Sequence, residues 1–292
     1  MAEARRLRRL ADAHWWAGVA AAALPLLLLL GLVWAGRLMP GTAVGAFARW
    51  CRHGLFGRPM PWMWASIALL VVPPALRATA STWRRLAATR RFCGHLAGLT
   101  GELPRPLAER AGRLGLAGRV RLWPAPVVDV RTVGLRRPVI LMTTQALELL
   151  SDDEFEAVLR HECAHLRRAD PIKVLVAGAL RDGFGWLPAV TVLLQGFEEA
   201  KEFAADAWAA AGSSPRTLAR ALVKVLLDGS YVLPPTVAAA PFTGTAEARL
   251  AYLIEGRPPA LALPGWRALV GSAGLSLLLW GVLLGSCVLS LR

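Results

Sequence analysis

Hydrophobic residues gather in three long runs along the chain. Residues 15–36 ("WWAGVAAAALPLLLLLGLVWAG") and residues 268–291 ("ALVGSAGLSLLLWGVLLGSCVLSL") carry no charged side chain, and residues 60–76 ("MPWMWASIALLVVPPAL") form a shorter run. A helix needs roughly 20 consecutive apolar residues to cross the core of a bilayer. The pattern therefore predicts three membrane-spanning helices.

Between the second and third runs the pattern changes to shorter, mixed elements. Residues 81–101 are typical of a basic helix, and residues 103–115 have a proline near their start and end with glycine, as many helices do. Residues 119–144 are rich in valine and are interrupted by proline and glycine, which predicts two or three short strands. Ser151 and Glu154 have the spacing of a capping box, so a further helix is expected to begin there.

Composition and charge favour a membrane protein over a nucleic-acid-binding protein. Hydrophobic residues make up 55% of the 292 residues, and the net charge is +14. The basic residues are dispersed without a nucleic-acid-binding motif, so no nucleic-acid partner is expected. Arginines flank the first two apolar runs, within residues 5–9 and 84–91, and the positive-inside rule then places the N-terminus and residues 78–265 in the cytoplasm. Four arginines within residues 37–58 argue against this orientation.

The four cysteines do not have metal-binding spacing. Cys51 and Cys287 are both expected near the outer side of the membrane, where a disulfide can form. The alternative, isolated small apolar side chains, is favoured for all four.

The stretch "RHECAHLRRADP", residues 160–171, carries candidate chemistry. On a helix, His161 and His165 lie on one face and can point both imidazoles at a single ion. Glu162 follows the first histidine and can act as general base on a water bound to zinc, as in HExxH metalloproteases. The alternative is a charged helix in which the two histidines occur by chance.

A third ligand is expected in the helical stretch 197–210, which offers Glu198, Glu199 and Glu202. The intervening apolar segment must turn back, and its best turn signal is "DGFG", residues 182–185. Two antiparallel arms of roughly 18 residues, about 27 Å long, bring Glu202 level with the histidines. Glu199 is the second choice. Asp206, one turn later, is expected either to hydrogen-bond a ligand histidine or to be a surface carboxylate.

The run "RRPVILMTTQALELLSDDEFEAVLRHECAHLRRADP", followed by "KEFAADAWA", resembles the membrane-embedded gluzincin peptidases, most closely the BlaR/MecR sensor-transducer peptidase family. The related HtpX-type and CAAX-type proteases share the histidine motif and the later pattern from Glu202 to Asp206. The resemblance implies that His161, His165 and Glu202 bind Zn²⁺ and that Glu162 is the catalytic base.

The same resemblance implies roles for residues outside the histidine motif. Val139, Ile140 and Leu141 correspond to a strand to which a substrate peptide can add, and a plain core strand is the alternative. Arg249 corresponds to a cleft arginine that stabilises an oxyanion. The alternative for Arg249 is a surface salt bridge. Asp170 is expected to have a structural role.

One departure concerns antibiotic sensing. The β-lactam sensors continue into an extracellular penicillin-binding domain, whereas this sequence stops at Arg292 and carries no Ser-x-x-Lys with its partner motifs. The sensing role is therefore not expected here.

Together, the residues and the resemblance predict an α-helical integral membrane protein with an α+β zincin-like (gluzincin) cytoplasmic domain. The expected boundaries are a two-span membrane region at 1–78, a zinc metallopeptidase domain at 79–265 with an apolar helical hairpin at 171–201, and a last span at 266–292. The expected location is a bacterial cell membrane, with the lipid bilayer as one partner; a homodimer is left open.

The predicted function is zinc-dependent endopeptidase activity at the cytoplasmic membrane face, in regulatory or quality-control proteolysis. A cytoplasmic repressor suits the first role as substrate, and damaged membrane proteins suit the second. The alternative is a catalytically silent membrane signalling subunit that keeps the protease fold.

Overall fold

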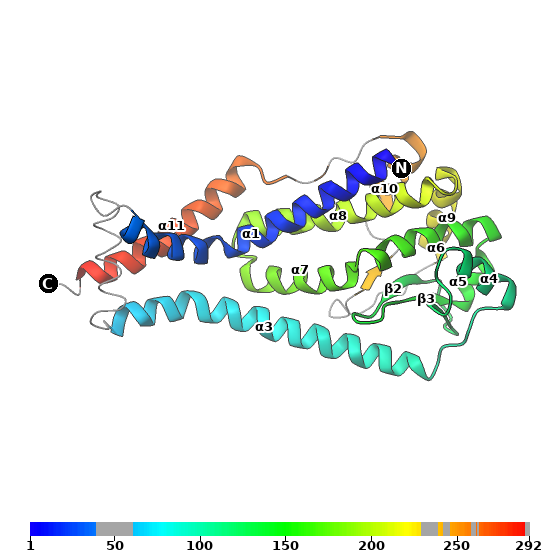
Figure 1. Cartoon of the computed structure of the whole chain (residues 1–292), viewed down its shortest axis with the longest axis horizontal. Coiled ribbons are helices and arrows are strands. Elements are labelled where there is room, and N and C mark those ends of the chain that lie inside the picture. The colour runs from blue at the N-terminus through cyan, green and yellow to red at the C-terminus, as the bar shows by residue number, and fades with distance from the viewer. Residues whose placement is uncertain (39–60, 229–238, 242–245, 258–260, 262, 290–292) are drawn as a thin grey trace. The chain divides into compact units, whose positions relative to one another are not determined.

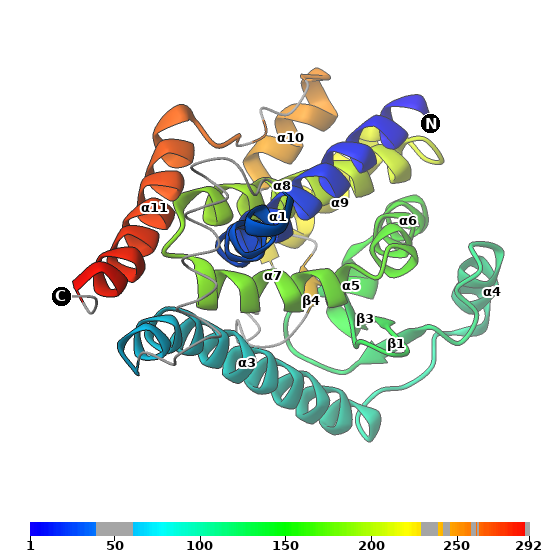
Figure 2. The same ribbon diagram turned by 60° about the vertical axis from the view of Figure 1, so that its left-hand side comes forward.

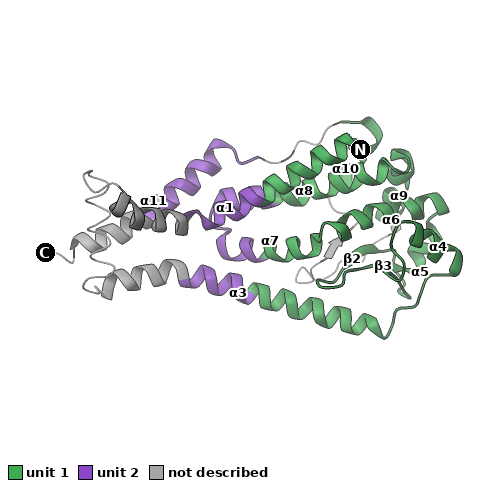
Figure 3. Cartoon of the chain, in the orientation of Figure 1, with its two compact units in different colours: residues 1–15, 81–178, 195–262 green, residues 16–80, 179–194, 263–292 purple. Residues whose placement is uncertain are grey.

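The computed structural model describes residues 1–38, 61–228, 239–241, 246–257, 261 and 263–289 (Figure 1). Helices dominate the described residues, and one small sheet accompanies them. The chain divides into two compact units (Figure 3). Unit 1 comprises residues 1–15, 81–178 and 195–262, and unit 2 comprises residues 16–80, 179–194 and 263–292.

Long helices form at the three apolar runs: α1 (Ala2–Leu38), α3 (Pro61–Ala97) and α11 (Trp266–Leu289). However, no helix among the described residues combines the length and the apolar character needed to cross a membrane. The prediction of an integral membrane protein with three spans is therefore wrong. The predominance of helix with a small sheet remains from the expected fold class.

Packing inside unit 2 gives a physical reason for this error. A methyl group added to Gly18 of α1 would lie 2.8 Å from the side chain of Leu194, so two helices approach closely there. The hydroxyl of Ser272 in α11 accepts a hydrogen bond from the backbone N–H of Ala189 at 2.9 Å. Part of the surface that the sequence assigned to lipid therefore packs against other helices, and composition alone does not distinguish the two environments. Residue 51 lies outside the described residues, and with it the expected pair of Cys51 and Cys287.

The sheet of unit 1 has four strands in the order β1-β3-β2-β4. Strands β1 (Val120–Trp123), β2 (Val130–Val133) and β3 (Val139–Thr143) confirm the short strands predicted from the valine-rich segment. Strand β3 pairs in parallel with β1, and β2 pairs antiparallel with both β3 and β4 (Ala239–Pro241). The fourth strand comes from far along the chain and was not predicted.

Two of the three helices around the first strands, α4 (Arg105–Arg113) and α6 (Asp152–Arg167), lie where the sequence predicts them, and α5 (Thr144–Leu149) was not predicted. Helix α4 lies within the predicted helical segment, and α5 follows β3. Helix α6 begins at Ser151 with the predicted capping box, in which Ser151 and Glu154 bond each other's backbone N–H groups. Its apolar side packs against β2 and β3, so α6 lies beside the sheet (Figure 2).

The remaining helices complete the surroundings of α6. Helix α7 (Asp170–Phe184) ends within the predicted turn, and α8 (Pro188–Ala210) begins after it. Helix α9 (Pro215–Asp228) packs against both α6 and α10 (Ala246–Glu255). These contacts bring residues from three distant parts of the sequence around the histidine-bearing helix.

Candidate metal centre

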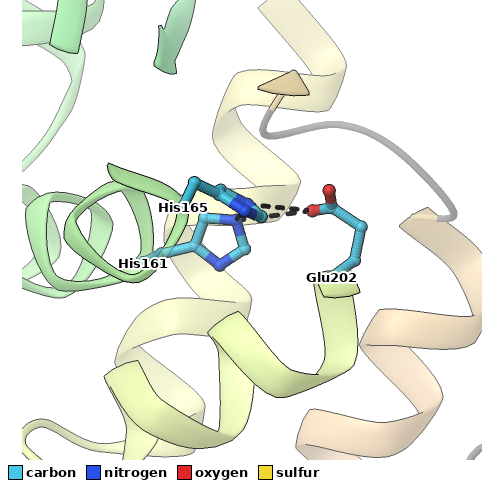
Figure 4. Close-up of side chains that lie close together, drawn as sticks. All are labelled: His161, His165 and Glu202. Carbon is cyan, nitrogen blue, oxygen red and sulfur yellow. Dashed lines mark hydrogen bonds and ion pairs between the residues drawn. The ribbon is translucent and has the colours of Figure 1, made fainter. Parts of the chain in front are cut away.

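His161 and His165 of α6 and Glu202 of α8 come together in the interior of unit 1 (Figure 4). The two histidine Nε2 atoms lie 3.0 Å apart. Glu202 Oε2 lies 3.4 Å from Nε2 of His161 and 3.6 Å from Nε2 of His165. All three side chains are buried, and one ligand atom of each lies within 4.8 Å of the others.

The local structure explains this meeting. The two histidines are four residues apart in one regular helix, so they share a face. The chain then reverses between α7 and α8 and returns Glu202 to that face. Glu199, the second choice from the sequence, lies elsewhere and accepts a hydrogen bond from Gln195 at 2.9 Å on the exposed side of α8.

His161 is fixed from behind by Asp206. Nδ1 of the histidine lies 2.9 Å from Asp206 Oδ1, so Nε2 is left facing the cluster. Asp206 is in turn held by Arg249, whose Nε and Nη2 donate to its two oxygens at 2.7 and 2.6 Å. Burial raises the pKa of Asp206, but the guanidinium of Arg249 and the contact with His161 outweigh it, so the pKa is lowered.

Arg249 is among the largest fully buried side chains, and Nη1 lies 3.5 Å from Glu202 Oε2. Two of its nitrogen atoms are engaged by Asp206, which makes this a buried ion pair and not a surface salt bridge. Burial disfavours the charged guanidinium, but the carboxylates of Asp206 and Glu202 more than compensate and raise the pKa of Arg249. The arginine therefore supports the ligand set from α10.

His165 has an equivalent partner. Its Nδ1 lies 2.7 Å from Asp170 Oδ2, and the same oxygen accepts a hydrogen bond from Arg168 at 3.0 Å. Burial disfavours the imidazolium, but Glu202 and Asp170 outweigh it and raise the pKa of His165 to about 9. Burial similarly opposes ionisation of Asp170, yet His165 and Arg168 hold the pKa of this carboxyl at about 2.

Glu202 is held at one oxygen only. Oε1 accepts a hydrogen bond from the buried ammonium of Lys201 at 2.5 Å, whereas Oε2 has no hydrogen-bond partner in the described structure. Burial raises the pKa of Glu202, but Lys201 and the two histidines lower it well below the ordinary value. Glu202 is therefore a carboxylate with one fixed oxygen and one oxygen facing the histidines.

This arrangement fits a metal ion. Two imidazole nitrogens and one carboxylate oxygen converge, and each ligand side chain has its other polar atom engaged by a neighbour. Histidine ligands in metal sites usually donate their second ring N–H to a carboxylate in this way. Two histidines and one glutamate form one of the ligand sets that zinc takes in catalytic sites, where a fourth position stays open for water.

Glu162 directly follows His161 in α6, between the two histidines, and it is fully buried. Its Oε2 accepts a hydrogen bond from the hydroxyl of Thr132 at 2.7 Å. Oε1 is buried without a hydrogen-bond partner among the described residues. The side chain therefore has one oxygen available for proton transfer.

The expected substrate strand requires a correction. Val139, Ile140 and Leu141 lie in β3, which pairs with β1 on one side and β2 on the other. A peptide adds to a sheet through unpaired backbone groups at an edge strand. β3 has neither edge free, and the buried side chains of Ile140 and Leu141 make it a core strand.

Two residues of the site, Lys201 and Thr132, were missed from the sequence, and the contact of a third, Asp170, was not predicted. Asp170 was expected to be structural, and its five-residue distance from His165 across a helix end was the available signal. Lys201 directly precedes Glu202, but neighbouring residues on a helix do not face each other, so no rule selected it. Thr132 lies on a strand far from the histidine motif, and no sequence pattern connects it with Glu162.

A comparison with known families covers the part of the chain that carries this site. The family model described as BlaR1 peptidase M56 matches residues 61–253, a segment that contains both histidines, Glu202 and Arg249. The chain belongs to the BlaR1 peptidase M56 family. No curated protein matches the sequence.

Membership in the M56 family confirms the resemblance to the BlaR/MecR peptidases and indicates a metallopeptidase type of function. It also suggests a membrane-associated protein. The cluster of His161, His165 and Glu202 lies within the matched segment and is compatible with zinc.

Proposed function

We propose that this M56 chain is an active zinc-dependent endopeptidase of the gluzincin type. His161, His165 and Glu202 hold the ion, and Glu162 is the general base. The observation that carries the proposal is the convergence of three ligand atoms, each on a side chain whose other polar atom is engaged. A silent relative has no need of such complete support behind every ligand.

The chemistry follows from the side chains. When bound, zinc supplies Lewis acidity, which lowers the pKa of a coordinated water and polarises the scissile carbonyl. Asp206 and Asp170 accept the Nδ1–H groups of His161 and His165, which keeps the Nε2 lone pairs directed at the ion. Glu162 takes a proton from the attacking water and later delivers it to the leaving amide nitrogen. The water oxygen forms the new C–O bond, the C–N bond breaks when Glu162 delivers the proton to nitrogen, and one water is consumed for each peptide bond.

The proposed substrates are proteins or peptides, and the proposed setting is regulatory or quality-control proteolysis at the cytoplasmic face of a bacterial membrane. Family membership supports association with a membrane. Exposed Arg5, Arg6, Arg8 and Arg9 near the N-terminus support attraction to anionic lipid head groups.

Two variants test the enzyme against a silent signalling subunit. Glu162→Gln keeps every proposed ligand, so zinc content should stay near one ion per chain while proteolysis falls about 10²–10⁴-fold. His161→Ala should lose zinc and proteolysis together. Self-cleavage of the purified full chain, followed by mass spectrometry with and without a chelator, provides an assay that needs no known substrate.

A third variant, Glu199→Gln, serves as the matched control, because Glu199 lies on the exposed side of the same helix as Glu202. It should leave zinc content and cleavage unchanged. If the zinc-loaded wild type and Glu162→Gln give the same cleavage products, or neither gives any, the chain is not an active peptidase.

A further inference from the structure

Thr132 lies where the sheet meets the proposed catalytic helix. It occupies the third position of β2 and is completely buried. Its hydroxyl lies 2.7 Å from Glu162 Oε2 and 3.2 Å from the backbone carbonyl oxygen of Glu162. One side chain of the sheet therefore contacts both the carboxylate and the backbone of the proposed base.

The backbone that carries Thr132 is held on both sides. It pairs with Ile140 of β3 and with Ala240 of β4, and both pairings are antiparallel. Threonine is also β-branched, which restricts its χ1 rotamers on a strand. Since α6 packs against β2 and β3, the hydroxyl is presented to Glu162 from a fixed place.

The hydrogen bond divides the work of the two carboxylate oxygens. A hydroxyl has one proton, and the 2.7 Å contact directs it to the carboxylate rather than to the carbonyl. Oε2 is then engaged, while Oε1 has no hydrogen-bond partner within the described part of the chain. One oxygen orients the group and the other is left to accept a proton.

We propose that Thr132 is a positioning residue for the general base Glu162: its hydroxyl fixes Oε2 so that Oε1 meets the attacking water. This proposal rests on the proposed endopeptidase function. Catalytic groups work best when their geometry is set before the substrate arrives, and small misplacements cost much of the rate. Without the hydroxyl, Glu162 gains freedom to rotate and its buried Oε2 loses its partner.

The test compares three threonine variants in the zinc-loaded full chain. Thr132→Val keeps the shape but removes the hydroxyl, and Thr132→Ser keeps the hydroxyl. Thr143→Val is the matched control, because Thr143 is a buried threonine of the same sheet whose hydroxyl bonds the backbone of Asp129 and Ala146. Zinc content, the thermal midpoint, kcat and KM are measured on a peptide taken from the self-cleavage site.

Thr132→Val should lower kcat about 10–100-fold, the loss expected when a hydrogen bond to a charged group is removed. KM and zinc content should stay at their wild-type values, because Thr132 contacts neither ligand side chains nor substrate in the proposed arrangement. Thr132→Ser should restore most of kcat, and Thr143→Val should retain it. If Thr132→Val does not fold, Thr132→Ala replaces it in the comparison with Thr132→Ser.

A double variant distinguishes positioning from a general effect on the sheet. If Thr132 acts through Glu162, adding Thr132→Val to Glu162→Gln should lower kcat no further. The proposal is overturned if Thr132→Val keeps wild-type kcat while Glu162→Gln is inactive, or if Thr143→Val loses as much kcat as Thr132→Val. If Glu162→Gln is as active as the wild type, the proposed function has failed instead.

Discussion

Asp170 lies 2.7 Å from Nδ1 of His165, although a helix end separates the two residues. Helix α6 ends at Arg167, and Ala169 then takes a left-handed conformation with φ 52°. This bend starts α7 at Asp170 and turns its carboxylate back toward the preceding helix. The bond between the helices therefore orients a proposed metal ligand.

Replacement of Asp170 should weaken metal binding. Asp170→Asn keeps the size of the side chain but replaces the charged carboxylate that bonds Nδ1 of His165 by a neutral amide. Loss of such a partner typically lowers metal affinity about 10–100-fold. Competition with a chromogenic chelator measures this, and Asp153→Asn on the exposed start of α6 is the control. Wild-type affinity in Asp170→Asn would mean that the carboxylate only joins two helices.

Arg249 and Asp206 form a buried ion pair, and breaking it should lower the free energy of unfolding strongly. Arg249→Met leaves Asp206 as a buried carboxylate without its ion-pair partner, which costs about 3–5 kcal/mol in comparable sites. Denaturant unfolding of the metal-free protein measures the loss. Arg257→Met is the control, because Arg257 pairs with Glu255 at 2.8 Å on the surface and such pairs contribute less than about 1 kcal/mol.

The double variant Arg249→Met/Asp206→Asn provides a further check on this pair. Since it removes both charges, it should cost less than the sum of the two single changes. Strict additivity would show that the two side chains do not stabilise each other.

The helix that carries the histidines was predicted from local pattern alone. Ser151 and Glu154 announce its start through side-chain hydrogen bonds to nearby backbone N–H groups, and such contacts depend on few residues. The spacing of His161 and His165 likewise needs only helical geometry. The position of Glu202 followed from equal arm lengths and a turn signal, which are also local quantities.

The remaining parts depend on packing between distant segments. Nothing near residue 239 announces that it pairs with β2, and nothing in β2 shows that Thr132 reaches Glu162. The prediction of membrane spans was wrong for a related reason. A long apolar run indicates that its side chains avoid water, but it does not distinguish contact with lipid from contact with other helices. Gly18 and Ser272 show that neighbouring helices take part of that surface.

The capping box at the start of α6 should contribute measurable stability. Ser151→Ala removes the acceptor for the N–H of Glu154, and loss of an N-cap typically costs about 1 kcal/mol. Zinc affinity should change little, because His161 lies more than two turns further along the helix. Thermal unfolding measures the effect, with Ser151→Asp as the control that keeps an acceptor. A loss in Ser151→Asp equal to that in Ser151→Ala would contradict the capping explanation.

The stability of the metal-free protein should depend on pH through His165 and Asp170. The pKa of His165 is raised from 6.5 to about 9 in the folded chain, so the folded state holds this proton more tightly than the unfolded state. The stabilisation is complete below the pKa that His165 has in the unfolded chain, and it is lost as the pH rises through the pKa that His165 has in the folded chain. The pKa of Asp170 is lowered from 3.8 to about 2, so its contribution is complete above 3.8 and is lost on acidification.

Thermal midpoints measured with a chelator should therefore be highest between pH 3.8 and 6.5, and they should fall between pH 6.5 and about 9. In His165→Gln the fall on the alkaline side should disappear, while the acid side persists in weakened form. Zinc should reverse the alkaline trend, because the ion requires neutral His165 and its uptake releases the proton. Proton release on zinc addition at pH 7 checks this directly in weakly buffered solution. A midpoint that rises across the alkaline window in the chelated wild type would show that His165 is already neutral when the ion is absent.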